Sequence, residues 1–219
     1  MNETLAEVIS KTEFYVRNEL ANDSSGHDWL HVYRVWKTAQ KLAEKEHADS
    51  TVVQLAALLH DIADWKFNDG NENIGPQKAR AWLEQLRVEE HIIAHVCQII
   101  KDLSFKGAHV KTAMKTKEGM IVQDADRLDA LGAIGVARTF AYGGHKGREM
   151  HDPNIKPELH STFEGYKNGK SPTINHFYEK LLLLKDRMNT QTAKVIAEQR
   201  HAYMEEYLKR FFDEWDQQI

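Results

Sequence analysis

The residues best suited to chemistry lie in the stretch from Leu58 to Asp64, where an apolar run ends in one imidazole and two carboxylates. These groups belong to His60, Asp61 and Asp64. Such groups among apolar neighbours are costly to bury unless something pairs with them. A divalent metal ion is one partner that takes both His and Asp. Taken alone, the stretch also fits a histidine stabilised by a helix dipole beside a solvated aspartate.

Other metal-binding residue types stand before and after this stretch. His31 lies three residues after Asp28 and four after His27, so the three side chains can share one helix face. A pair of aspartates, Asp124 and Asp126, stands in a later apolar segment. Two imidazoles and two carboxylates from three helices are the kind of metal site that helical bundles build. Completed by water, such a set suits Mn²⁺, Fe²⁺, Co²⁺, Ni²⁺ or Zn²⁺ better than Ca²⁺.

The carboxylate of Asp64 allows a second role. Adjacent residues of a helix point about 100° apart, so His60 and Asp61 can reach one ion only near the helix end. Asp64 follows them by four and three residues, which puts a further carboxylate over the same place. It can orient or deprotonate a bound water.

The elements that must hold these residues are helices. Apolar residues recur at helical spacing nearly everywhere, and we find no alternating pattern typical of strands. The spacing predicts an all-α bundle whose central, buried helix carries His60. Ser50 and Thr190 are the expected N-caps of two of the helices, and residues 64–76 and 142–172 are expected to be loops. The predicted helices cover residues 3–20, 27–45, 50–62, 76–86, 89–103, 118–140, 174–188 and 190–215.

Composition limits the classes of protein to be considered. With 219 residues, 42% hydrophobic and 28% charged, the chain is typical of a globular protein. The net charge of -4 argues against general binding to nucleic acids. Cys97 is the only cysteine, which favours a reducing compartment. No apolar run is long enough to span a membrane, and the first residues do not resemble a secretory leader. We therefore expect a cytoplasmic protein that binds neither membranes nor nucleic acids.

The order of these residues resembles a known family. His31, then His60-Asp61, then an aspartate of the Asp124–Asp126 segment is similar to the pattern of the HD-domain metal-dependent phosphohydrolase superfamily, over residues 20–140. The strings at 26–35, 57–64 and 123–130 resemble the bacterial YpgQ/YedJ-type branch. The strings at 176–181 and 188–190 extend this resemblance over nearly the whole chain.

The resemblance implies a ligand set and a fold. It implies His31, His60 and Asp61 as metal ligands and an Ala-Asp pair for the fourth, which favours Asp126 over its rival Asp124. It also implies one HD domain over residues 1–219, with a metal-binding core at about 20–140 and a helical extension at 141–219. Family members with two metals carry extra histidines where this chain has residues 99–102, so one ion is expected, with Mn²⁺ the first choice. Asp129 and His27 are the expected outer partners of the ligands.

An activity is implied as well. The branch implies a nucleotide pyrophosphohydrolase, which cleaves nucleoside triphosphates, expected to be deoxy ones, to monophosphate and pyrophosphate. Alternatives on the same scaffold are a phosphomonoesterase such as a 5′-nucleotidase and a cyclic-nucleotide phosphodiesterase. A non-catalytic sensor or adaptor with a structural metal is an alternative of another class. A homodimer is also considered. Candidate cations for the substrate's phosphates are Lys106, Lys146, Arg148, Lys180 and Lys185.

Overall fold

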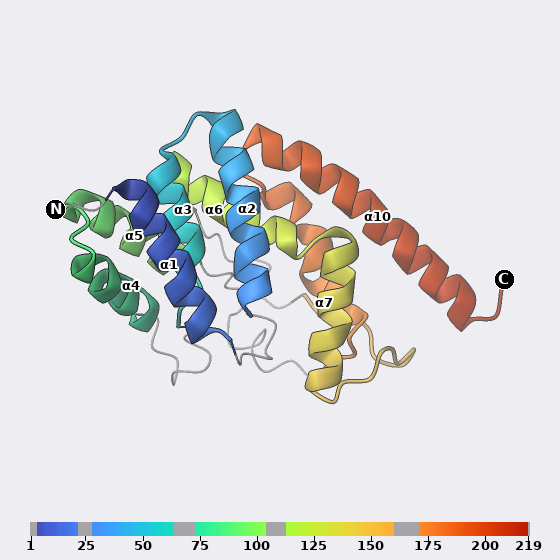
Figure 1. Cartoon of the computed structure of the whole chain (residues 1–219). Helices are drawn as coiled ribbons and strands as arrows, with labels where there is room; N and C mark the ends of the chain where they lie inside the picture. The colour runs from blue at the N-terminus through green and yellow to red at the C-terminus, as the bar shows by residue number, and fades with distance from the viewer. Residues whose placement is uncertain (1–3, 22–27, 64–72, 104–112, 160–170, 219) are drawn as a thin grey trace. The chain divides into compact units, whose positions relative to one another are not determined.

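The computed structural model describes residues 4–21, 28–63, 73–103, 113–159 and 171–218. All regular secondary structure in these ranges is helical, which confirms the predicted all-α class. Within the same ranges, no helix is both long and apolar enough to cross a bilayer. Figure 1 shows the helices in chain order by colour. They are α1 (Leu5–Glu19), α2 (Trp29–Glu46), α3 (Ser50–Leu59), α4 (Ile74–Gln85), α5 (Glu90–Asp102), α6 (Lys117–Asp129), α7 (Gly132–His145), α9 (Asn175–Glu179), the 3₁₀ turns η2 (Leu181–Leu183) and η3 (Lys185–Arg187), and α10 (Gln191–Trp215).

Two compact units divide the chain. The first holds α1 to α5 and the part of α6 that ends at Ala125. In it, α3 packs against α1, α2 and α5, and α4 packs against α5. Leu55, Leu58 and Leu59 of α3 are completely buried, as the apolar character of this helix all round requires. The helix that ends next to His60 is therefore the central helix of the first unit.

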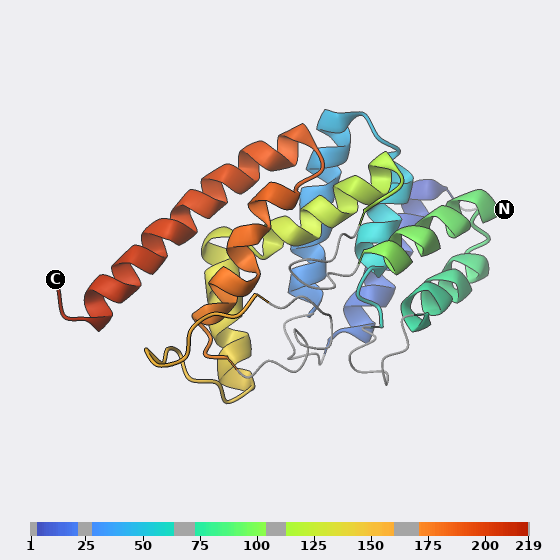
Figure 2. The ribbon, with the colours of Figure 1, turned by 180° about the vertical axis from the view of Figure 1, so that it is seen from behind.

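The second unit starts at Asp126, within the continuous helix α6, and holds every later element. Here α7 and η3 pack against α10, and α9 packs against η2 (Figure 2). The rings of Phe140, Phe177 and Tyr207 form one cluster, because each pair of ring centroids lies 6.1 or 6.2 Å apart. This aromatic cluster joins α7, α9 and α10 around a common core.

The predicted single helix over residues 118–140 is wrong, because the structure has two helices there. Helix α6 ends at Asp129, and α7 starts at Gly132 after Leu131, whose backbone is extended. Gly132 has a φ of 73°, a left-handed conformation that glycine adopts without the strain a side chain would bring. The break turns the chain directly after the segment that carries Asp124 and Asp126.

The predicted helix over residues 174–188 is also wrong in its length. Only α9 is α-helical, and the chain continues as the two 3₁₀ turns. Leu181 and Leu184 are both buried, and residues three apart share one face of a 3₁₀ turn. Burial of these two leucines on one side therefore agrees with the tighter turn.

One of the two predicted N-caps is correct. Thr190 caps α10, and its side chain accepts a hydrogen bond from the backbone N–H of Ala193. The cap of α3 is Asp49, one residue before the predicted Ser50. Its carboxylate accepts hydrogen bonds from the N–H groups of Thr51 and Val52 at 2.8 and 3.2 Å. A carboxylate accepts more strongly than a hydroxyl at the positive end of a helix, which explains the difference.

Candidate metal centre

Helix α2 holds His31 in its first turn. Asp28 is the N-cap, and its carboxylate accepts a hydrogen bond of 2.8 Å from the His31 N–H. The imidazole of His31 is buried, on the same inner face as Val32 and Val35. The cap fixes where the helix begins, and the helix then directs the imidazole inward.

His60 follows the last residue of α3 and is buried as well. Its Nδ1 lies 2.8 Å from the carbonyl oxygen of Ala57, one turn back in the same helix. A carbonyl oxygen can only accept, so Nδ1 carries the hydrogen in the neutral ring. The lone pair is then on Nε2. Metal-binding histidines are usually held in this way, with one ring nitrogen donating to the backbone and the other facing the ion.

The carboxylate of Asp61 lies close to both imidazoles. Its Oδ2 is 3.4 Å from Nε2 of His31 and 3.4 Å from Nε2 of His60. The two rings themselves are 5.4 Å apart between centroids. Two atoms that bind one ion tetrahedrally at about 2.1 Å are about 3.4 Å from each other. A lone-pair nitrogen and a carboxylate oxygen at this spacing repel each other, and a cation shared between them removes the repulsion.

Asp126 completes the cluster. Ligand atoms of His31, His60 and Asp126 all lie within 4.8 Å of one another, in the only such grouping among the described residues that includes a histidine pair. Asp124, two residues earlier on the same helix, is completely buried and is not part of that grouping. Residues two apart on a helix point about 200° from each other. The geometry therefore favours Asp126 as the fourth ligand, as the sequence predicts.

The donor set fits a divalent transition metal. Two imidazole nitrogens and a carboxylate oxygen of Asp126 lie within 4.8 Å of one another, the Asp61 carboxylate is 3.4 Å from both imidazoles, and one imidazole is already oriented by its backbone hydrogen bond. Nitrogen donors of this kind suit Mn²⁺, Fe²⁺, Co²⁺, Ni²⁺ or Zn²⁺, whereas Ca²⁺ prefers oxygen throughout. His31, His60 and Asp126 thus form a candidate metal site, with Asp61 beside it.

Asp129, an expected outer partner of the ligands, binds a cation of the next helix. Its Oδ2 accepts a hydrogen bond of 2.8 Å from Arg138 of α7, and the carboxylate is almost fully buried. Arg200 of α10 donates to the backbone carbonyl of Leu128 beside it. Burial lowers the pKa of the Arg200 guanidinium, and the charge of Asp129 partly offsets this effect. These contacts hold the end of α6, one turn after Asp126, and the sequence did not predict them.

Three residues with predicted roles lie outside the described part of the chain: Asp64, His27 and Lys106. Their roles stay predictions.

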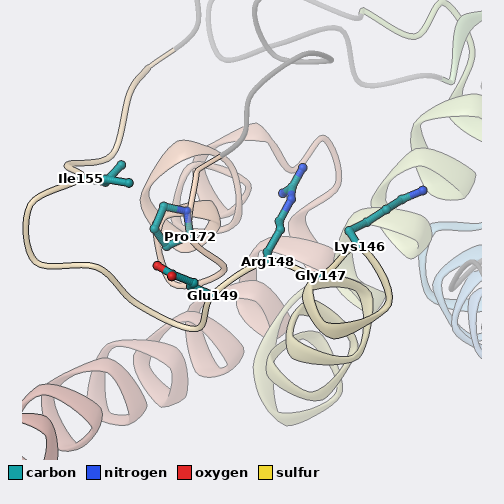
Figure 3. Close-up of a pocket in the computed structure, with 6 residues that line it drawn as sticks. All are labelled: Lys146, Gly147, Arg148, Glu149, Ile155 and Pro172. Atoms are coloured by element: carbon teal, nitrogen blue, oxygen red, sulfur yellow. The ribbon is translucent and has the colours of Figure 1, made fainter.

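The structure describes the other four predicted substrate cations. Lys146 and Arg148 line one pocket at the end of α7 (Figure 3), whereas Lys185 lies 3.6 Å from the Glu198 carboxylate of α10. The charge of Lys180 affects the pKa of His176, a histidine for which no role was predicted. Burial, followed by the charges of Lys180 and Arg148, lowers the pKa of His176 to about 3. The spacing of four residues between His176 and Lys180 was the available signal.

The chain is similar to known proteins over nearly its whole length. Residues 29–131 match the family model of the HD domain. The protein YpgQ of Bacillus subtilis (strain 168) is 38% identical over 198 residues, which are 90% of this chain and 88% of that protein.

Three solved structures resemble both compact units. A protein of Lactobacillus plantarum has a TM-score of 0.84 and 38% identity, over 95% of this chain and 96% of that one. An HD-superfamily hydrolase of Bacillus thuringiensis has a TM-score of 0.76 and 48% identity, over 97% and 99% of the two chains. Bacillus subtilis YpgQ in complex with ADP has a TM-score of 0.74 and 34% identity, over 94% and 97%.

Proposed function

The chain belongs to the HD-domain superfamily, and on that premise we propose that it is a metal-dependent nucleotide pyrophosphohydrolase. Its substrate is a nucleoside triphosphate, first of all a deoxy one, and its products are the monophosphate and pyrophosphate. The observation that carries the proposal is the grouping of His31, His60 and Asp126, with the Asp61 carboxylate 3.4 Å from both imidazoles. ADP bound to the relative YpgQ supports a nucleotide as the ligand.

The proposed reaction is hydrolysis of the bond between the α- and β-phosphates. Water attacks the α-phosphorus, the bond to the bridging oxygen breaks, and pyrophosphate leaves with that oxygen. When bound, a divalent ion supplies polarisation of a phosphoryl oxygen and a lower pKa of water. His31, His60, Asp61 and Asp126 are the residues that would hold it.

The chain's own residues have separate tasks in this proposal. The hydrogen bond from His60 Nδ1 to the Ala57 carbonyl keeps Nε2 directed at the cluster. Asp64 is proposed to take the proton of the attacking water, as predicted from its spacing. Lys146 and Arg148, which line one pocket, are proposed to neutralise phosphate oxygens, and Lys180 is proposed for the same role because it acts with Arg148 on His176. The single cysteine, Cys97, is the reason for proposing a cytoplasmic enzyme.

Product identification tests this function. The protein is stripped of metal, reloaded with Mn²⁺ and incubated with each of the deoxynucleoside triphosphates, and phosphorus NMR follows the reaction. We expect monophosphate and pyrophosphate in equal amounts. Orthophosphate as the first product would mean a phosphomonoesterase, and turnover of cyclic nucleotides alone would mean a phosphodiesterase. No turnover of any nucleotide would leave the non-catalytic alternative.

Three variants test the roles of the metal cluster and of Asp64 in the activity. His31→Ala should abolish turnover, whereas His91→Ala should leave it unchanged, because His91 is an exposed histidine next to Glu89. Asp64→Asn should keep the metal and lose at least about a hundredfold in kcat, which is typical of the loss of a general base. An Asp64→Asn enzyme with full kcat would remove Asp64 from the mechanism while the metal cluster stands.

A further inference from the structure

Two cations lie side by side where α7 ends. The Lys146 N–H closes the last turn of the helix, Gly147 has a φ of 64°, and the Arg148 N–H returns to the Gly143 carbonyl at 2.9 Å. This reversal is a common helix end that needs glycine at its left-handed position. It brings the Lys146 ammonium and the Arg148 guanidinium to 5.6 and 5.9 Å from the ring centre of Tyr142. The aromatic ring thus holds both cations at one place.

These cations line a pocket of about 440 Å³. Its other walls are Gly147, Glu149, Ile155 and Pro172. In Figure 3 the side chain of Arg148 extends upward and that of Lys146 extends to the right, whereas Glu149 lies beside Pro172 to the left of both. The volume is within the usual range of small-molecule sites.

Backbone pairing fixes the walls of the pocket. The N–H groups of Thr173 and Ile174 donate to the carbonyls of Glu149 and Met150 at 2.8 and 2.9 Å. The side chain of the buried Asn175 donates to the Ile155 carbonyl at 2.9 Å. The segment at 149–155 is therefore fastened to the start of α9.

The buried carboxylate of Glu179 connects the segments that contain Glu158 and Ser171. Glu179 is almost fully buried, and it accepts hydrogen bonds from the Glu158 N–H at 3.2 Å and from the Ser171 hydroxyl at 3.0 Å. Together, the hydrogen bonds of Glu179 and Asn175 hold the segments around the pocket in place before a ligand binds. A ligand that enters it meets groups already held in place, which reduces the entropy lost on binding.

Arg148 also acts, together with Lys180, on the nearby histidine His176. Arg148 and Lys180 both raise the positive potential at His176. Burial is the largest cause of the low pKa of His176, and the two charges add to it, so its imidazole is neutral at pH 7. A neutral imidazole can donate one hydrogen bond without adding charge. Arg148 thus lines the pocket and also acts on His176, whereas His176 and Lys180 are not among the lining residues.

We propose that the pocket lined by Lys146 and Arg148 binds a phosphate-type oxyanion. A planar guanidinium and nearby ammonium groups are the side chains that match such an anion. The source of the anion is the polyphosphate of a nucleotide or free pyrophosphate, and the first of these rests on the proposed function. The oxyanion chemistry itself needs neither the metal nor turnover.

Calorimetric titration of the metal-free protein with inorganic pyrophosphate tests the site. Arg148→Gln and Lys146→Gln should each weaken binding by about tenfold or more, since each removes a charge-assisted hydrogen bond. Lys194→Gln is the matched control, because Lys194 is an exposed lysine on α10 of the same unit, and it should bind as the parent does. Lys146 is itself exposed, so its variant should fold even if Arg148→Gln does not.

A competing nucleotide identifies the source of the anion. The same titration is repeated with a saturating nucleoside triphosphate in metal-free buffer, in which no hydrolysis occurs. Loss of the pyrophosphate signal means that the pocket takes the nucleotide's phosphates, and an unchanged signal means that it takes the free anion; both support an oxyanion site. Equal pyrophosphate affinity of the parent and both pocket variants would overturn the proposal. That result would leave the proposed hydrolase function intact, since its test uses the metal cluster.

Discussion

Asp124 and Asp126 share one helix, yet their surroundings differ. Asp124 is completely buried, whereas Asp126 is partly accessible and groups with His31 and His60. Because two helical positions are about 200° apart, one ion cannot be bound equally well by both. We expect Asp126→Ala to lose bound Mn²⁺ and Asp124→Ala to keep it, as measured by elemental analysis after dialysis.

A stability measurement must accompany this pair. Asp124→Ala removes a completely buried carboxylate and leaves the groups that interact with it without their partner, so it should lower the melting temperature more than Asp126→Ala does. Metal content is therefore measured well below both melting temperatures. Metal retained by Asp126→Ala and lost by a folded Asp124→Ala would reassign the fourth ligand.

His176 gives the protein a pH-dependent stability. Its pKa in the folded protein is about 3, and its ordinary value is 6.5. Between these values the unfolded chain holds a proton that the folded protein does not, so acid favours unfolding. The contribution is constant above pH 6.5, and below it stability falls by at most about 1.4 kcal/mol per pH unit. Urea unfolding at pH 7 and pH 5 should show a smaller loss in His176→Asn than in the parent.

For individual residues, the sequence predicts chemical roles better than it predicts packing partners. His31, His60, Asp61 and an aspartate near 126 stand out because metal ligands come from few residue types in a set order. The low pKa of His176 and the pairing of Asp129 with Arg138 depend on residues distant in sequence. No local spacing specifies those neighbours, and so neither feature was predicted.

The helices show where periodicity is a good guide and where it fails. The predicted long helices at 3–20 and 190–215 agree with α1 and α10 within two residues. The predicted helix at 118–140 is interrupted at Gly132, where the backbone changes direction. The apolar residues keep a helical spacing across this position, so the pattern does not indicate the break. The burial of Leu181 and Leu184 favours the 3₁₀ turns after α9. Tertiary packing, which periodicity does not contain, decides both cases.

Two adjacent glycines of α7 test the packing of the second unit. A Cβ on Gly143 would lie 2.2 Å from the hydroxyl oxygen of Thr173, a buried side chain, whereas a Cβ on Gly144 would meet nothing within 4 Å. Gly143→Ala should therefore destabilise the protein by about 1–3 kcal/mol. Gly144→Ala should stabilise it by about 0.5–1 kcal/mol, since alanine favours the helix. Urea unfolding of both variants measures the contrast, and equal effects would refute the close approach.

For the molecule as a whole, the fold class was predictable, and the division into two compact units was not. The helical pattern extends without interruption through residues of both units. Family resemblance covers them together, so it does not indicate a boundary. The boundary at Asp126 lies inside α6, and the sequence has neither proline nor glycine between Gly119 and Gly132 to mark it. The division into two units depends on contacts between residues distant in sequence, which a sequence pattern does not specify.

The metal should stabilise the whole protein, because its ligands come from three distant parts of the chain. The unfolded chain does not hold His31, His60 and Asp126 together, so an ion that binds only the folded state favours folding. Mn²⁺ at a hundred times its Kd adds about 2.7 kcal/mol, which raises Tm by about 5–10 °C for a chain of this size. Scanning calorimetry with EDTA and with Mn²⁺ measures the shift. His91→Ala should keep it and His31→Ala should lose it; the same shift in both variants would mean that the ion binds elsewhere.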